Sequence, residues 1–137
     1  MATATAIPAS GKVTAVREGL VIFNPAGTSY ELQLVCPTYN GPINSPVHGV
    51  VRVKARKIYT VPSGGLFITP IFGPPRIIQG RIRALDTQSM VLHAGGAEVT
   101  VDFPANDDAF DLASGPLTIG RMANVVALPG ATFEFVR

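Results

Sequence analysis

Three basic residues alternate along one predicted strand: Arg52, Lys54 and Arg56, with Val53 and Ala55 between them. Alternate residues of a strand share one face, so the three positive charges project together while the small apolar residues point inward. A basic face beside aromatic side chains is typical of single-stranded nucleic-acid binding. That hypothesis uses the following residues as contacts to phosphate and bases: Arg52, Lys54, Arg56, Tyr59, Arg81 and Arg83.

The same basic face has a second interpretation, which the composition favours. Positive charge on an exposed strand prevents edge-to-edge aggregation. Aromatic residues make up only 7% of the chain, and tryptophan is absent. A nucleic-acid partner therefore stays an alternative and is not the favoured prediction.

An acidic segment, Asn106-Asp107-Asp108-Ala109-Phe110-Asp111, raises the question of a calcium site. A calcium loop needs oxygen ligands on a defined schedule, with a glycine turn and usually a closing glutamate. Neither follows at the required spacing. The segment instead predicts a solvated loop, or one helical turn capped by Asn106 or Asp107, and no bound metal.

Catalytic patterns are weak in this sequence. His48 and His93 have no second His or Cys at ligand spacing, and Cys36 follows an apolar strand, as a small buried hydrophobe would. There is no nucleophile turn of the Gly-x-Ser-x-Gly type, no phosphate loop and no dinucleotide fingerprint. A Ser-His-Asp triad stays open because its members can come from anywhere in a chain. We expect a protein that is not an enzyme and carries no cofactor.

The composition indicates which elements position these residues. Of 137 residues, 47% are hydrophobic and 15% charged, with 14 glycines and 12 prolines. Frequent turns between short apolar runs predict many short strands. The longest uncharged stretch, 58–75, is broken by proline and glycine and cannot form a spanning helix, so no membrane association is expected. One cysteine fits a reducing compartment, and we expect a cytoplasmic protein without a signal peptide.

An internal repeat appears when the chain is shifted along itself by about 69 positions. Gly11-Lys12-Val13 falls on Gly80-Arg81-Ile82, and Val21-Ile22-Phe23 falls on Met90-Val91-Leu92. Apolar type matches at alternate positions without a gap, as in two copies of one structural unit.

Each copy is expected to contain five strands, near 11–17, 19–24, 28–36, 49–59 and 65–71, and near 77–86, 89–94, 97–103, 117–128 and 131–136. In each copy a turn, Ser63-Gly64-Gly65 or Pro129-Gly130, should join the fourth and fifth strands as a hairpin. Three strands, a longer connection and a final hairpin are the order of the OB-fold. The prediction is an all-β chain of two tandem five-stranded OB-like Greek-key barrels. Their expected bounds are a flexible tail 1–10, a first barrel 11–72, a Pro-rich linker 73–76 and a second barrel 77–137.

The sequence also resembles a known class of small barrels. Gly-Lys-Val-Thr-Ala-Val at 11–16 and His-Gly-Val-Val-Arg-Val-Lys-Ala at 48–55 resemble OB-like or TOBE-like tandem modules, some of which bind molybdate. The Ser-Ala-Arg-Asn start and the Thr/Ser-bearing loop of those oxyanion binders are absent, so no binding residue is carried over. Small-oxyanion binding between subunits, by backbone N–H groups and basic side chains, is a further alternative.

Self-association is the leading functional expectation. A small monomer has much surface and needs charge to cover it, and this chain has little. Residues 1–75 carry six Lys/Arg against two Asp/Glu, and residues 76–137 carry five against seven; this asymmetry either helps copies to pack head to tail or has no consequence. We expect a homo-oligomeric, non-catalytic binding or assembly protein. Contacts between barrels or subunits are predicted at Ile68, Ile71, Phe72, Ile77 and Ile78.

Overall fold

The chain is all-β, and its strands form one mixed sheet. The structure, a computed structural model, describes residues 6–136, and within that range the only helical segment is a single 3₁₀ turn, η1 (Asp107–Ala109). Nothing in this range is a helix with the length and apolar character needed to cross a bilayer. The strands are β1 (Ala9–Arg17), β2 (Leu20–Pro25), β3 (Glu31–Val35), β4 (Pro46–Val61), β5 (Phe67–Thr69), β6 (Phe72–Gly73), β7 (Ile77–Leu85), β8 (Ser89–Ala94), β9 (Ala97–Asp102), β10 (Phe110–Asp111), β11 (Met122–Ala127) and β12 (Thr132–Val136).

Strand pairing forms two rings, each of which returns to its starting strand. In the first ring β1 pairs with β2, β2 with β3, β3 with β12, β12 with β4, and β4 with β1. In the second ring β7 pairs with β8, β8 with β9, β9 with β4, β4 with β11, and β11 with β7. In both rings one pairing, β3 with β12 or β9 with β4, is parallel, and the other pairings are antiparallel.

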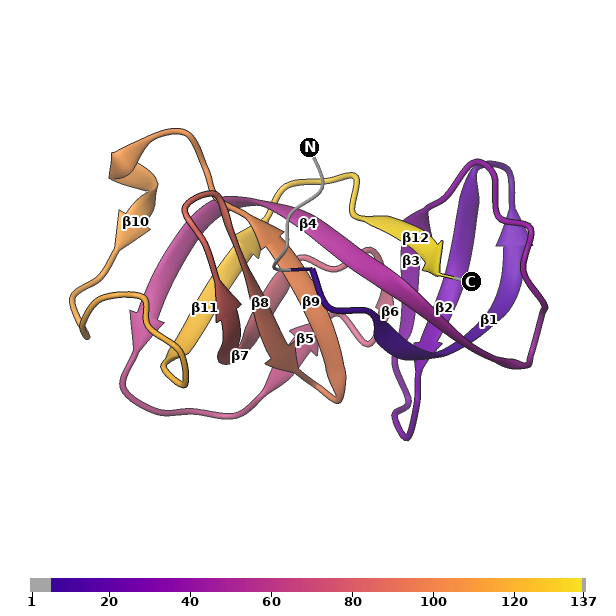
Figure 1. Ribbon diagram of the computed structural model, residues 1–137, viewed down its shortest axis with the longest axis horizontal. Helices are drawn as coiled ribbons and strands as arrows, with labels where there is room; N and C mark the ends of the chain where they lie inside the picture. The colour runs from indigo at the N-terminus through magenta and orange to yellow at the C-terminus, as the bar shows by residue number, and fades with distance from the viewer. Residues whose placement is uncertain (1–5, 137) are drawn as a thin grey trace.

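A long central ribbon joins the two rings. β4 has 16 residues and spans about 50 Å at the usual rise of a strand, so it runs the length of the molecule (Figure 1). β11 and β12 follow one another along it in the antiparallel direction, from Met122 beside Val61 to Val136 beside His48. The segment between them bends at Gly130, where φ is +96°. Each ring therefore contains a strand from the other half of the sequence.

The two expected hairpins between fourth and fifth strands are wrong. After Ser63-Gly64-Gly65 the chain forms β5, which pairs with β7 and not with β4. After Pro129-Gly130 it forms β12, which pairs with β4 and β3 and not with β11. The physical reason is the length of β4: it offers one continuous edge to both β11 and β12, so neither half has to fold back on itself.

Most other boundaries agree with the expected elements to within three residues. The strand expected at 117–128 begins five residues later, at Met122, and the short strands β6 and β10 were not expected. β1 begins at Ala9, so the end of the expected 1–10 tail is a strand, while residues 1–5 lie outside the described part of the chain. β4 begins at Pro46, three residues earlier than expected. The units 11–72 and 77–137 stay a prediction about the sequence, because strand pairing crosses from one to the other.

The two halves share local details at positions 69 residues apart. The β1–β2 register shifts between Val13 and Ala15, and the β7–β8 register shifts between Ile82 and Ala84. A Cβ atom added to Gly11 would lie 2.3 Å from the carbonyl oxygen of Asn24, and one added to Gly80 would lie 2.4 Å from that of His93. Only glycine allows the backbones to approach this closely.

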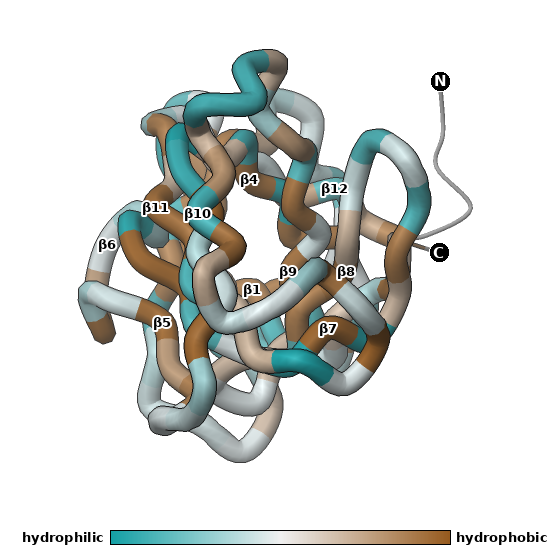
Figure 2. Tube along the Cα trace, turned by 90° about the vertical axis from the view of Figure 1, so that its left-hand side faces the viewer, coloured by the Kyte–Doolittle hydropathy of each residue, from teal (hydrophilic) through white to brown (hydrophobic). Residues whose placement is uncertain are grey.

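The interiors of both rings belong to one apolar core, and the hydrophobic residues, brown in Figure 2, lie mostly along the strands. Phe23, Leu32 and Leu34 fill the first ring, and Leu92, Val99 and Val101 hold the equivalent pairing positions in the second; all are fully buried. Leu32 pairs with Phe23 as Val99 pairs with Leu92, so the third strands correspond at a shift of 67 residues (99 − 32) and the repeat contains a two-residue gap before them. Phe133, on β12, is 3% exposed, and its ring lies 4.9 Å from that of Phe23. The last strand of the chain thus completes the core of the first ring.

Candidate binding groove

A groove opens to solvent at the junction between the two rings. Its volume is about 890 Å³, within the usual range of ligand sites. One wall comes from β2 and β3, a second from the connection between β5 and β7, and a third from the bend between β11 and β12. The lining residues are Leu20, Gln33, Val35, Arg56, Thr69, Pro70, Pro74, Pro75, Arg76, Ile77, Val126, Ala127, Pro129, Gly130 and Ala131.

The walls of the groove are preorganised. Four of its lining residues are prolines, which have a fixed φ and no amide hydrogen to satisfy. The wall between β5 and β7 is held by two backbone hydrogen bonds, from Arg76 N to Thr69 O and from Ala127 N to Arg76 O, both 2.8 Å. A wall that does not have to become ordered on binding preserves affinity.

Two guanidinium groups line the groove. Arg56 lies at a β-bulge, since Val126 pairs with Lys57 and Ala127 pairs with Ala55, which leaves Arg56 unpaired in the ladder. Arg76 ends the Pro-rich connection. Both side chains are exposed, and among residues 6–136 neither forms an ion pair. The groove therefore combines apolar walls with two uncompensated positive charges.

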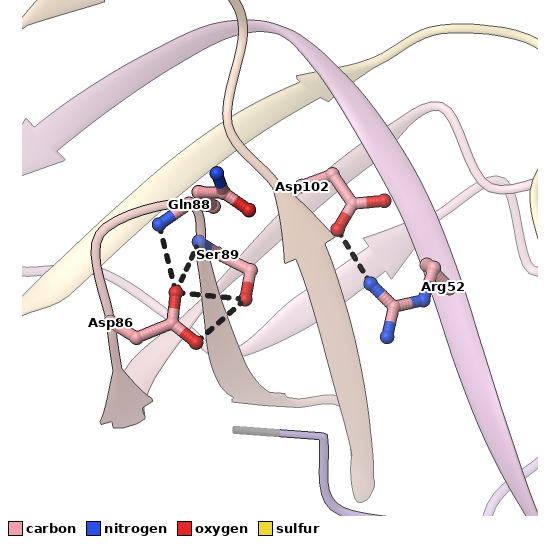
Figure 3. A network of polar contacts seen from close by, with 5 residues as sticks. All are labelled: Arg52, Asp86, Gln88, Ser89 and Asp102. Carbon is pink, nitrogen blue, oxygen red and sulfur yellow. Dashed lines mark hydrogen bonds and ion pairs between the residues drawn. The ribbon is translucent and has the colours of Figure 1, made fainter. Parts of the chain in front are cut away.

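The rest of the predicted basic face is partly neutralised. Arg52 donates to Asp102 at 2.5 Å, joining β4 to the end of β9 (Figure 3). In the adjacent turn Asp86 accepts hydrogen bonds from the backbone of Gln88 and Ser89, also drawn in Figure 3. The Arg52–Asp102 pair leaves less free charge on the face of β4, and the hydrogen bonds of Asp86 hold the turn between β7 and β8.

Two other predicted cations also have partners within the chain. Arg83 pairs with Glu98 at 2.7 Å, and Glu98 also lies 2.9 Å from His93 Nδ1. Arg81 donates to the Gly120 carbonyl at 3.1 Å. Lys54 is exposed and has no ion pair among the described residues. Of the six residues predicted for nucleic-acid contact, only Arg56 lines the groove.

Tyr59, the predicted stacking residue, is half-buried. The Lys57 ammonium lies 5.5 Å from the centre of its ring. A cation over the ring occupies a face that a base would need. Stacking at Tyr59 would therefore require Lys57 to move.

The five predicted contact residues divide into three groups. Ile68 and Ile78 are 1% and 0% exposed and belong to the chain's own core. Ile77 is half-buried and lines the groove. Ile71 and Phe72 are 52% and 65% exposed, although both are apolar. Only the last three are placed to contact another molecule.

Cys36, His48 and the residues of the acidic segment do not line the groove. Cys36 is 8% exposed, and burial raises the pKa of its thiol above the ordinary value, which leaves little thiolate to react. His48 Nδ1 lies 3.1 Å from Ser10 Oγ, as an ordinary polar contact. Within residues 6–136, no group of three or more His, Cys, Asp or Glu side chains is arranged to hold a metal ion.

The sequence did not indicate the groove itself. The sequence predicts Pro74, Pro75 and Arg76 as part of a linker, and Gln33 as one position of a half-buried strand. A proline pair followed by arginine is a local signal that could have marked a rigid, charged wall. The opposite wall comes from the β11–β12 bend, whose position depends on the pairing of β12 with β3 and β4.

Comparison with known proteins gives no relative: no family model, no curated protein and no solved structure matches this chain.

Proposed function

We propose that this chain is a non-catalytic protein that assembles with copies of itself, and that the groove and its apolar rim form the contact surface. The rim consists of Ile71 and Phe72. The observation that carries the proposal is the 65% exposure of Phe72, which lies in the connection between Pro70 and Pro74, two lining residues of the preorganised groove. A contiguous exposed apolar patch with polar edges marks an interaction site, and aromatic anchors contribute most to such interfaces.

The chemistry of the lining supports binding over catalysis. The groove contains no carboxylate, imidazole or thiol, and its one hydroxyl belongs to Thr69. General acid–base catalysis needs a titratable group near the working pH, and nucleophilic catalysis needs a base beside the nucleophile. This lining offers shape, apolar surface and positive charge instead.

We also infer that the rings are OB-like barrels, each of which is completed by a strand from the other half of the chain. In each ring the first three strands are followed by a strand from the other half of the chain, β12 in the first ring and β4 in the second. The fourth strand of the ring's own half, β4 or β11, comes next and closes on the first strand. The shared bulge positions and the equivalent glycines Gly11 and Gly80 support two copies of one unit. The pairing of β12 with β3 and β4 places the β11–β12 bend opposite the Pro-rich wall, and in this way it builds the groove.

A charged side chain at the rim is expected to abolish assembly. We predict that Phe72→Asp reduces the mass of the wild-type oligomer to that of the 14.4 kDa monomer in light scattering after size exclusion. The physical reason is that burial of an unpaired carboxylate in an apolar contact costs several kcal/mol. Ile43→Asp is the matched control, because Ile43 is 45% exposed in the connection before β4 and should tolerate the change. A wild-type chain that is monomeric at every concentration would refute the proposal.

Single-stranded nucleic-acid binding is the second candidate function. The observation in its favour is that Lys54 and Arg56 are exposed and have no ion pair among the described residues. This function predicts that a fluorescent single-stranded oligonucleotide co-elutes with the protein at low salt and is lost at high salt or in Lys54→Glu/Arg56→Glu. Oxyanion binding at Arg56 and Arg76 would instead raise the melting temperature with molybdate, sulfate or phosphate.

A further inference from the structure

An acidic projection stands at one end of the molecule. Asp107 and Asp108 lie in η1, Asp111 ends β10, and Leu112 follows it; we call these four residues the acidic knob. All four are exposed, and Leu112 is 39% exposed. Figure 1 shows η1 and β10 outside the second ring, at the end opposite β1 and β2.

The knob is mounted rigidly. β10 pairs in parallel with the far end of β4, Phe110 beside Ile58 and Asp111 beside Tyr59. The ring of Phe110 packs edge-on against that of Phe103, with centres 5.6 Å apart. The backbone N–H of Ala113 donates to Asp111 Oδ1 at 3.2 Å. A charged surface held in this way loses little entropy when it docks.

The three carboxylates have no cationic partner within the described chain. The ion pairs among residues 6–136 involve Asp102 and Glu98, and none involves the knob. The two arginines of the groove are likewise unpaired. One molecule therefore carries an acidic projection and a basic, apolar recess. Asp111 lies beside Tyr59, three residues along β4 from Arg56, but no ion pair joins the knob to the groove within residues 6–136.

We infer that the groove receives the acidic knob of a second copy of this chain. The carboxylates would face Arg56 and Arg76, and Leu112 would lie against the prolines and Ile77 at the apolar floor. The inference rests on the proposed self-assembly and assigns the partner surface. Charge complementarity across such a contact fixes orientation and excludes like-charged alternatives.

The contact is heterologous, because the knob and the groove are different surfaces. Each copy has one of each, so copies join head to tail and either close a ring or extend as a filament. The net charge of +2 is small, so general repulsion between copies is weak. The local charges therefore decide the association.

Charge reversal tests the pairing directly. The groove variant is Arg56→Glu/Arg76→Glu, and the knob variant is Asp107→Lys/Asp108→Lys/Asp111→Lys. Each alone opposes like charges, so we expect association to weaken at least tenfold in sedimentation velocity. An equimolar mixture restores opposite charges at every contact and is expected to recover the wild-type mass. All five substituted side chains are exposed, and circular dichroism checks that each variant is folded.

The possible outcomes separate the two proposals. Lys54→Glu is the control, since Lys54 is an exposed cation outside the groove lining, and it should associate as the wild type does. If both reversed variants keep the wild-type mass while Phe72→Asp is monomeric, the knob pairing is refuted and the rim-mediated assembly stands. A mixture that stays monomeric also refutes the pairing. A neutral variant, Arg56→Gln/Arg76→Gln, should weaken association less than the reversal does; equal loss in both would show that charge pairing is not the cause.

Discussion

Phe133→Ala is expected to lower the free energy of unfolding by about 3–5 kcal/mol, the usual cost of removing a buried phenylalanine. The side chain is 3% exposed and lies between Phe23 and Tyr39, with ring centres 4.9 and 6.2 Å away. It belongs to β12, at the end of the chain, yet it fills the core of the ring that the first residues build. Urea unfolding followed by circular dichroism measures the change.

The control for this prediction lies on the same strand. Val136 is 38% exposed, so Val136→Ala should change stability by less than about 0.5 kcal/mol. If Phe133→Ala lowered the free energy of unfolding no more than Val136→Ala does, β12 would not be part of the first ring. The pairing of β12 with β3 and β4 would then be wrong.

Gly80→Ala and Gly11→Ala are each expected to cost about 3 kcal/mol, at the upper end of overpacking effects. The added methyl groups would lie 2.4 and 2.3 Å from backbone carbonyl oxygens of β8 and β2. Backbone cannot move aside as a flexible side chain does, so β7 or β1 would have to separate from its neighbour. Thermal unfolding of the two variants gives the comparison.

The matched control for both glycines is Gly65→Ala. A methyl group at Gly65 would meet only the Phe67 ring, at 3.9 Å, an ordinary contact distance. We expect it to change stability by less than about 1 kcal/mol. Similar costs at Gly11 and Gly80 would support two copies of one unit, whereas a large cost at only one of them would argue against their equivalence.

The sequence predicted the strands well, because alternation of apolar residues is a local property. Tyr30 to Leu34 and Glu98 to Phe103 alternate cleanly, and β3 and β9 lie there. Glycine and proline also marked most turns. The pairing of β5 with β7 and of β12 with β3 and β4 could not be predicted, since Ser63-Gly64-Gly65 has the composition of a hairpin turn whichever strand follows as the partner. Which edge β5 and β12 meet depends on contacts between residues far apart in the chain.

The site was predicted only in part, for a related reason. Arg56 and Phe72 were named because charge alternation and excess apolar residues are visible in the sequence. Their shared location beside one groove depends on the bulge at Arg56 and on the path of the Pro-rich connection. Ile68 and Ile78 have the same apolar character as Ile71, but β5–β7 pairing places them in the core.

Hydrogen–deuterium exchange of the wild-type protein, compared between micromolar and millimolar concentration, tests the central claim most directly. Assembly through the groove predicts slower exchange at the higher concentration for the amides of Ile71, Phe72 and Gly73 and of the bend 128–132. Docking of the acidic knob predicts slower exchange at the higher concentration for the amides of residues 107–113 as well. Exchange that is identical at both concentrations, or slowed only in other segments such as 40–45, would contradict the claim that copies of this chain meet at the groove.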